Sequence, residues 1–273
     1  MKFLERFFGQ KNDEPTPAEP VVSSVTPLEN ESNRKFEGPY SSPKEKELLE
    51  REIKKKGKLL GGQIGSAQFV SLKEDGGGVF KPYSDYEGAK KEMFILRERA
   101  AYLINLFLEF DIVPPTVIRD VDNTTGSFQE FITDAETGYE LSEQERSAVG
   151  DQLFKMYIFD EIINNDDRNA GNWLVKDGKV YAIDHGYSLA MEDAGKKYLS
   201  SIVLSRALPE ETVAKLRRFV ESEENKDILK KLLYELFDKR LVDAYMKRIA
   251  AFAGAIMEDG QLSEEVFQSN LVS

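Results

Sequence analysis

The sequence contains no cysteine and only one histidine among its 273 residues. The absence of cysteine excludes disulfides, thiolate zinc sites and cysteine nucleophiles, and it fits a reducing compartment. The single histidine, His185, also excludes a metal site that needs two imidazole ligands. Any chemistry must therefore use other groups, and the 49 Asp and Glu residues make carboxylates the first candidates.

The sequence also lacks a long apolar run and an excess of positive charge. No stretch approaches the roughly 18 to 20 apolar residues of a membrane-spanning helix. The start shows neither the apolar region nor the small-residue cleavage site of a signal peptide, so we expect a cytoplasmic location. The net charge of -12 repels the phosphate backbone of nucleic acid, and we expect no nucleic acid partner.

Residues 1–45 are predicted to be a tail that precedes the folded part of the chain. From about Gln10 to Pro43 the sequence is rich in Pro, Ser, Glu and Asn and has few aromatic residues, a composition typical of disorder. Ahead of this linker, residues 1–9 place apolar side chains at helical spacing among basic ones. Peripheral contact of this segment with a membrane and docking of it on the folded domain both remain open.

Residues 46–135 are predicted to form a small lobe of strands with one long helix. Strand-like patterns bounded by turn residues recur in the segments 67–72, 78–81, 116–119 and 127–133. Apolar residues at spacings of three and four predict a helix over 85–109, which ends before Pro114. The first two segments flank the turn 75–78 and are predicted to form a β-hairpin, and residues 122–126 are predicted to be the turn between the last two.

Residues 136–273 are predicted to form a mostly helical lobe. A capping box from Ser142 to Glu145 starts a helix that continues, mostly buried, to Ile163. The later patterns are two strands over 173–175 and 180–183 and, after Leu199, helix starts at Pro209 and Ser222 and an amphipathic stripe over 228–252. The chain is therefore predicted to have an α+β fold, with a β-rich N-terminal lobe and a helical C-terminal lobe.

A glycine-rich segment and a following lysine have the arrangement of a phosphate-binding site. Gly65 allows the backbone to approach a phosphate, and Ser66 offers a further donor. Lys81 ends the returning strand of the predicted hairpin, from which its ammonium can reach the phosphates of a nucleotide. Glu98 and Glu92 lie on nearly one face of the following helix, and either can pair with this lysine. The Walker pattern ending in Gly-Lys-Ser/Thr is missing, which disfavours a P-loop fold.

The most informative segment runs from Asn164 to Gly186. Asp167 and Asn172 have the Asp-x-x-x-x-Asn spacing of a kinase catalytic loop. A carboxylate at Asp167 can accept a hydrogen bond from the attacking hydroxyl, and the Asn172 amide oxygen can bind magnesium. Asp184, at the end of the next predicted hairpin, stands where a metal-binding Asp-x-Gly is expected. Together these spacings predict an ATP- and Mg2+-dependent phosphotransferase.

Six segments of the chain carry a family resemblance: Gly65 to Val70 (phosphate loop), Val79 to Pro82 (ATP-lysine strand), Val113 to Thr116 (next strand), Gly126 to Ile132 (strand before the hinge), Asp167 to Leu174 (catalytic loop) and Ala182 to Gly186 (metal motif). In this order they resemble the phosphatidylinositol 3-/4-kinase superfamily, and within it most the type II phosphatidylinositol 4-kinases and their bacterial relatives. The resemblance covers roughly residues 57–189. It implies a two-lobed protein-kinase-like fold that binds ATP and Mg2+.

The resemblance also implies roles for individual residues. Arg168 would belong to the catalytic loop beside Asp167. Gln129, Phe131 and Ile132 would lie at the hinge, where backbone groups near the last two residues receive adenine. The eukaryotic members resemble one another in a cysteine-rich segment that is lipidated, and a chain without cysteine has no counterpart of it.

The resemblance favours a phosphatidylinositol-type lipid as the acceptor of the γ-phosphate. More distant kinases of similar design, such as the HipA-type enzymes, make a protein Ser/Thr acceptor the first alternative. A nucleotide-binding regulatory module without transfer activity is disfavoured, because every residue expected to handle ATP and metal is present. Transfer of a nucleotide group in an inverted pose is a further alternative that the sequence leaves open.

Overall fold

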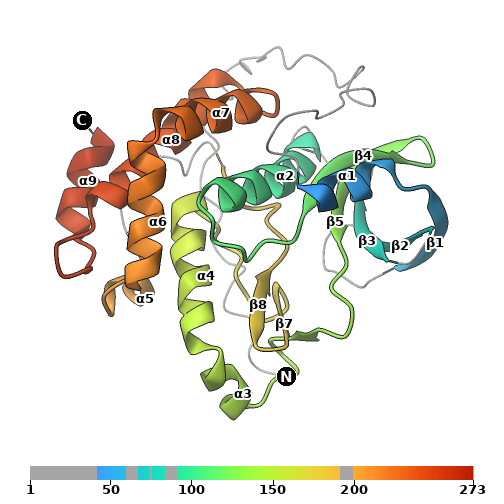
Figure 1. Cartoon of the computed structure of the whole chain (residues 1–273), viewed down its shortest axis with the longest axis horizontal. Coiled ribbons are helices and arrows are strands. Elements are labelled where there is room, and N and C mark those ends of the chain that lie inside the picture. The colour runs from blue at the N-terminus through green and yellow to red at the C-terminus, as the bar shows by residue number, and fades with distance from the viewer. Residues whose placement is uncertain (1–41, 60–66, 74–75, 84–90, 191–198, 273) are drawn as a thin grey trace, which may run out of the picture. The chain divides into compact units, whose positions relative to one another are not determined.

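The computed structural model describes residues 42–59, 67–73, 76–83, 91–190 and 199–272. Within these ranges the chain has the two-lobed α+β fold that the sequence predicts (Figure 1). The first lobe is built on a five-stranded sheet, and the second combines helices with a three-stranded sheet. The strands of the second sheet are β6 Glu136–Thr137, β7 Trp173–Lys176 and β8 Lys179–Ala182.

The sheet of the first lobe has the strand order β1-β2-β3-β5-β4, and every neighbouring pair is antiparallel. Its strands are β1 Ile53–Leu59, β2 Gln68–Leu72, β3 Gly77–Pro82, β4 Thr116–Val121 and β5 Thr124–Glu130. The predicted hairpin is confirmed as β2 and β3. β1 lies ahead of the first strand-like segment that alternation identifies, residues 67–72, because three successive lysines hide the alternation in it. β5 ends at Glu130 rather than at residue 133.

Two hairpins turn through a pair of residues with positive φ. Asp122 (φ 51°) and Asn123 (φ 63°) join β4 to β5, and Asp177 (φ 51°) and Gly178 (φ 74°) join β7 to β8. Positive φ at both central residues is typical of the type I′ turn, whose twist matches that of the flanking strands. The turn predicted over residues 122–126 is therefore too long, since the strands continue to the residues on either side of the pair.

Two helices accompany the first sheet: α1 Pro43–Glu50 and α2 Lys91–Phe107. α1 begins inside the segment predicted as a tail, because Ser42 and Glu45 form a capping box at its start. Its Leu48 is buried in an apolar cluster with strand residues such as Phe80. α2 confirms the predicted long helix, whose expected beginning at residue 85 lies outside the described residues.

The helices of the second lobe are α3 Glu143–Ala148, α4 Gly150–Ile163, α5 Ser201–Leu204, α6 Glu210–Glu221, α7 Glu223–Tyr234, α8 Lys239–Gly254 and α9 Glu264–Val272. The predicted helix starts are confirmed, because Pro209 and Ser222 are the N-caps of α6 and α7. The amphipathic stripe over 228–252 is divided between two helices, since Asp238 caps a new one, α8.

The helix predicted from the capping box to Ile163 is interrupted. Ser142 and Glu145 form the box as expected, with reciprocal side-chain and backbone hydrogen bonds. Val149 then leaves helical geometry, at φ -102° and ψ 14°, so that α3 ends and α4 begins as a separate helix.

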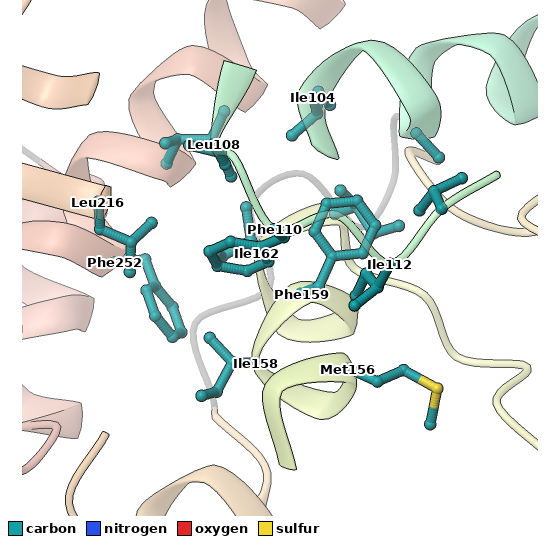
Figure 2. Packing of buried hydrophobic residues seen from close by; sticks show 14 of the residues in the cluster. Ile104, Leu108, Phe110, Ile112, Met156, Ile158, Phe159, Ile162, Leu216 and Phe252 are labelled. Atoms are coloured by element: carbon teal, nitrogen blue, oxygen red, sulfur yellow. The ribbon is translucent and has the colours of Figure 1, made fainter. Parts of the chain in front are cut away.

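The largest apolar cluster joins α2 and α4 with the helices of the second lobe. Figure 2 shows its centre, where Phe110 and Phe159 meet edge to face with ring centroids 5.7 Å apart and Ile162 lies beside them. α4 is buried on most sides, as expected of a helix whose apolar residues lie on several faces. No described helix is both long and apolar enough to cross a membrane. This packing fixes the end of α4, where the polar loop begins.

Candidate active site

Lys81 lies near the end of β3, and its ammonium group contacts two carboxylates. Nζ donates to Glu98 Oε1 on α2 and, at 2.9 Å, to Asp184 Oδ1 after β8. The Lys81 and Glu98 side chains are 15% and 3% exposed, whereas that of Asp184 is 46% exposed. Of the two glutamates predicted as partners, Glu98 makes the contact, and the side chain of Glu92 lies outside the described residues. A strand, a helix and a loop thus meet at one cation.

Burial and charge act in opposite directions on these carboxylates. The Lys81 ammonium holds the pKa of Asp184 below its ordinary value. Burial raises the pKa of Glu98, while Lys81 and the His185 amide, which donates to Glu98 Oε2 at 3.1 Å, favour the ionised form. Asp184 therefore combines a negative charge with access to solvent.

The polar loop after α4 holds Asp167 and Asn172 against each other. α4 ends at Asn164, whose left-handed backbone (φ 49°) turns the chain into the loop. The Asn172 side-chain nitrogen donates to the Asp167 carbonyl at 2.6 Å and to its carboxylate at 3.2 Å. Asn169 donates to the other carboxylate oxygen at 3.3 Å. Two amides therefore orient the Asp167 carboxylate, and within the described residues the Asn172 amide oxygen accepts no hydrogen bond.

Arg168 ties this loop to α4 and to the segment after β8. Its guanidinium makes a bidentate contact with Asp160, from Nε to Oδ2 and from Nη2 to Oδ1, both at 2.8 Å. Nη1 donates to the Ile183 carbonyl at 2.8 Å and also to the Asn172 carbonyl. Both charged side chains are nearly buried. Because one planar group reaches both segments, Arg168 fixes Asn172 relative to the residue before Asp184.

Asp160 and His185 complete this network, although the motif spacing points to neither role. Asp160 is a buried acidic residue near the end of α4, and because the equally acidic Glu161 follows it, the sequence gives no signal that singles it out. The His185 ring is fully buried, and its Nε2 accepts from Arg168 Nη2 at 3.0 Å, since a guanidinium can only donate. Burial and the adjacent guanidinium hold the pKa of His185 well below its usual value, so the ring is neutral.

Asn172 and Asp184 supply oxygen atoms of the kind that Mg2+ prefers. The Ile183 amide donates to the Asn172 carbonyl at 3.0 Å, which brings the residue before Asp184 next to Asn172. In the part of the chain that the structure describes, no three His, Cys, Asp or Glu side chains gather as a metal site. One carboxylate and one amide oxygen suit Mg2+ nonetheless, because this ion commonly takes its other ligands from water and substrate phosphates.

The residues predicted to contact the rest of the nucleotide are described only in part. Gly65 and Ser66 of the phosphate loop lie outside the described residues. Lys81 of β3 lies opposite Ser127 of β5, and Gln129 is two residues from Ser127 along β5. Gln129 and Lys81 therefore lie on the same face of the sheet. Its buried amide donates to Thr116 Oγ1 at 2.9 Å, so this side chain bridges β5 to β4.

The hinge segment follows β5. The Phe131 amide donates to the Gly77 carbonyl at 3.1 Å, and its ring meets Phe69 edge to face with centroids 4.8 Å apart. This contact uses the Phe131 N–H within the protein, so an adenine contact at this residue would need its carbonyl oxygen. The Ile132 amide has no hydrogen-bond partner among the described residues and stays the predicted donor to adenine.

Comparison with solved structures finds several proteins to which this chain is similar. The structure of hydra Fam20 with sugar is 15% identical, and the match covers 73% of this chain and 83% of that chain with a TM-score of 0.50. The Golgi casein kinase with Mn/ADP bound is 17% identical, with coverage of 81% and 73% and a TM-score of 0.49. The Helicobacter pylori proinflammatory kinase CtkA is 14% identical, with coverage of 81% and 96% and a TM-score of 0.49. The likeness to Fam20 establishes a shared fold and nothing about activity.

Comparison of sequences identifies the family. Protein Rv2133c of Mycobacterium tuberculosis is 30% identical in a match that covers 36% of this chain and 47% of that protein, so the match spans about half the length of this curated relative. The family model for phosphatidylinositol 3- and 4-kinase matches residues 97–246, more than half of the chain. The matched range includes Glu98 and the whole segment from Asp167 to Asp184. The chain therefore belongs to the phosphatidylinositol 3- and 4-kinase family, a family of phosphotransferases.

Proposed function

We propose that the chain is a kinase that uses ATP and Mg2+ to phosphorylate an alcohol group, with a phosphatidylinositol-type lipid as the acceptor. The observation that carries this proposal is the contact of Lys81 with both Glu98 and Asp184. Three segments far apart in the sequence converge there on one cation, an arrangement suited to binding the phosphates of ATP. The family match supports the phosphotransferase class, and the description of the family supports the lipid.

Each polar side chain has one task in this proposal. Asp167 accepts a hydrogen bond from the acceptor hydroxyl and so aims its oxygen at the γ-phosphorus. That oxygen bonds to phosphorus while the bond to the leaving oxygen of ADP breaks, and the hydroxyl proton passes to the Asp167 carboxylate. Lys81 stabilises the negative charge of the phosphates, and Asn172 and Asp184 would hold Mg2+. Mg2+ held by these residues would neutralise negative charge on the phosphates of ATP.

A lipid acceptor requires a membrane surface. We propose a cytoplasmic enzyme, similar to the type II phosphatidylinositol 4-kinases, that meets its lipid at that surface. The amphipathic segment 1–9, which would provide peripheral contact, lies outside the described residues. A protein Ser/Thr acceptor is the alternative, and the same assay can distinguish it from a lipid.

The test compares the full chain with Asp167→Asn and with Asp166→Asn, which makes the same change at the neighbouring carboxylate. Each protein is incubated with γ-labelled ATP and Mg2+ and with phosphatidylinositol vesicles or a cell lysate. We expect labelled lipid from the wild type and Asp166→Asn, and about 100-fold less from Asp167→Asn, because it loses the general base.

Two results would change the proposal. Equal labelling of any acceptor by the wild type and by Asp167→Asn contradicts the role of this carboxylate. Labelling of lysate proteins, with none of the lipid, replaces the lipid acceptor by a protein.

A further inference from the structure

Three consecutive charged residues of α2 are buried: Arg97, Glu98 and Arg99 are 8%, 2% and 5% exposed. Their side chains reach different parts of the molecule. Arg97 Nη1 donates to the Gly186 carbonyl at 3.3 Å, in the segment after β8. Glu98 contacts Lys81. Arg99 contacts helix α1 and strand β4, which the candidate active site does not include.

Arg99 joins α2 to α1 through a buried ion pair. Its Nη1 donates to Glu45 Oε1 at 2.5 Å and to the Thr116 carbonyl of β4 at 2.6 Å. Both charged side chains are almost fully shielded from solvent. The Tyr102 hydroxyl, one turn further along α2, donates to Glu45 Oε2 at 3.1 Å. Two side chains of α2 therefore hold a single carboxylate of α1.

The same carboxylate also starts α1. Glu45 Oε2 accepts the Ser42 amide at 2.8 Å, and Ser42 Oγ accepts the Glu45 amide at 3.2 Å. This capping box stabilises the first turn of the helix. α1 also buries Leu48 in the cluster that contains Phe80, the strand neighbour of Lys81. Figure 1 shows α1 beside α2 and β4. Loss of the Glu45 carboxylate therefore weakens α1 and its attachment to α2 together.

The contacts of Arg99 and Glu98 are coupled by helix geometry. Adjacent residues leave a helix about 100° apart around its axis, so these two side chains anchor α2 on neighbouring faces. A rotation or shift of α2 that breaks the Arg99 contacts also moves Glu98 away from Lys81. We propose that α1 is a strap that fixes α2 where Glu98 reaches Lys81, with Glu45 and Arg99 as positioning residues. This inference rests on the proposed function, in which Lys81 binds the phosphates of ATP.

Glu45→Ala in the full chain tests the strap, and Glu50→Ala is the matched control at an exposed position of the same helix. The assay uses Mg-ATP and phosphatidylinositol vesicles. We expect Glu45→Ala to lower kcat about 10- to 100-fold, because small displacements of catalytic groups have effects of this size. The KM for ATP is expected to rise as well, because a displaced Glu98 no longer holds Lys81 where it contacts the phosphates of bound ATP. Glu50→Ala is expected to match the wild type.

Hydrogen exchange adds a readout that needs no substrate. The His185 amide donates to Glu98 Oε2, so its exchange rate reports whether α2 is in place. Well below the unfolding midpoint of each protein, we expect faster exchange at His185 in Glu45→Ala and an unchanged rate in Glu50→Ala. A lower unfolding midpoint with wild-type kcat and wild-type exchange makes Glu45 a stabilising residue only, and overturns the inference.

Glu45→Gln is the milder variant, because its amide oxygen can still accept from Arg99. Its kcat is expected to fall between those of the wild type and Glu45→Ala. If Glu45→Ala does not fold, Glu45→Gln decides: a reduced kcat with faster exchange at His185 supports the strap, and wild-type values of both overturn it. A wild-type chain that labels neither lipid nor protein contradicts the proposed function, while the exchange measurement still tests the strap.

Discussion

At the residue scale, one guanidinium holds the candidate site together, since Arg168 contacts an aspartate, a histidine and two backbone carbonyls. Lysine has the same charge but lacks the planar fork that matches a carboxylate. We expect Arg168→Lys to lower the free energy of unfolding by about 2 kcal/mol or more, because buried acceptors lose their donors. Unfolding in urea measures this loss.

Arg218→Lys is the control, at an exposed ion pair with Glu109, and it is expected to leave the unfolding midpoint nearly unchanged. Equal losses in the two variants contradict the account of Arg168.

Tyr187 is expected to contact the acceptor. It is 40% exposed and packs edge to face on Phe94, with centroids 5.0 Å apart. Burial raises the pKa of its phenol, and the charges of Asp167 and Asp184 raise it further. Tyr187 also follows Asp184 by three residues. We expect Tyr187→Ala to raise the KM for phosphatidylinositol vesicles about tenfold, the effect of losing one aromatic contact.

The KM for ATP separates this role from a general defect. It is expected to stay within about threefold of wild type in Tyr187→Ala, and Tyr187→Phe, which keeps the ring, is expected to resemble the wild type. An unchanged KM for the lipid in Tyr187→Ala removes this side chain from the acceptor site.

Some residues of the site can be predicted from sequence and others cannot. Asp167, Asn172 and Asp184 can, because phosphoryl transfer needs their groups at fixed separations along the chain. Asp160 and Glu45 cannot be predicted, because the role of each depends on an ion pair with a buried arginine that forms only in the folded chain. No local pattern records such a partner.

At the scale of elements, two glycines differ in how much space the structure leaves for a side chain. Gly138 follows β6, and a Cβ there would lie 2.2 Å from the Trp173 ring, whereas a Cβ at Gly150, the start of α4, would meet nothing within 4 Å. We expect Gly138→Ala to lower the free energy of unfolding by about 1–3 kcal/mol through overpacking. Gly150→Ala is expected to raise it by about 0.4–1 kcal/mol. Thermal unfolding compares them, and a change of the same sign in both would be inconsistent with this packing.

Elements with a strong period can be predicted, and those fixed by distant contacts cannot. The apolar spacing of α2 and the many apolar residues of α4 identify both segments as helical from sequence alone. β1 escapes such a prediction because its successive lysines do not alternate, and its position depends on pairing with β2. α1 has the charged composition of a tail, and the contact of Glu45 with Arg99 makes it part of the first lobe.

At the scale of the whole molecule, a ligand bound by Lys81 from one lobe and by Asn172 and Asp184 from the other should stabilise the folded chain by mass action. We expect Mg-ATP at 100 times its Kd to raise the free energy of unfolding by about 2.7 kcal/mol. Removal of the metal with EDTA is expected to reduce the gain, and Lys81→Met to remove most of it. Thermal unfolding with and without ligand is the measurement. An equal gain in Lys81→Met contradicts the ATP site.

The order of motifs along the sequence predicts two lobes, but it does not predict which residues form the contacts between them. The bond from Arg97 to the Gly186 carbonyl, for example, joins residues far apart in the chain whose types suggest no pairing. Such contacts depend on how α2 packs, which the sequence pattern alone does not specify.

The central claim is that the γ-phosphate of ATP passes to an alcohol group aimed by Asp167. The most direct measurement supplies ATP labelled at the α-phosphate or, separately, at the γ-phosphate, together with Mg2+ and phosphatidylinositol vesicles. The account predicts labelled lipid from the γ-label alone, and about 100-fold less of it with Asp167→Asn. Lipid labelled from the α-phosphate would mean nucleotide transfer and would contradict the account.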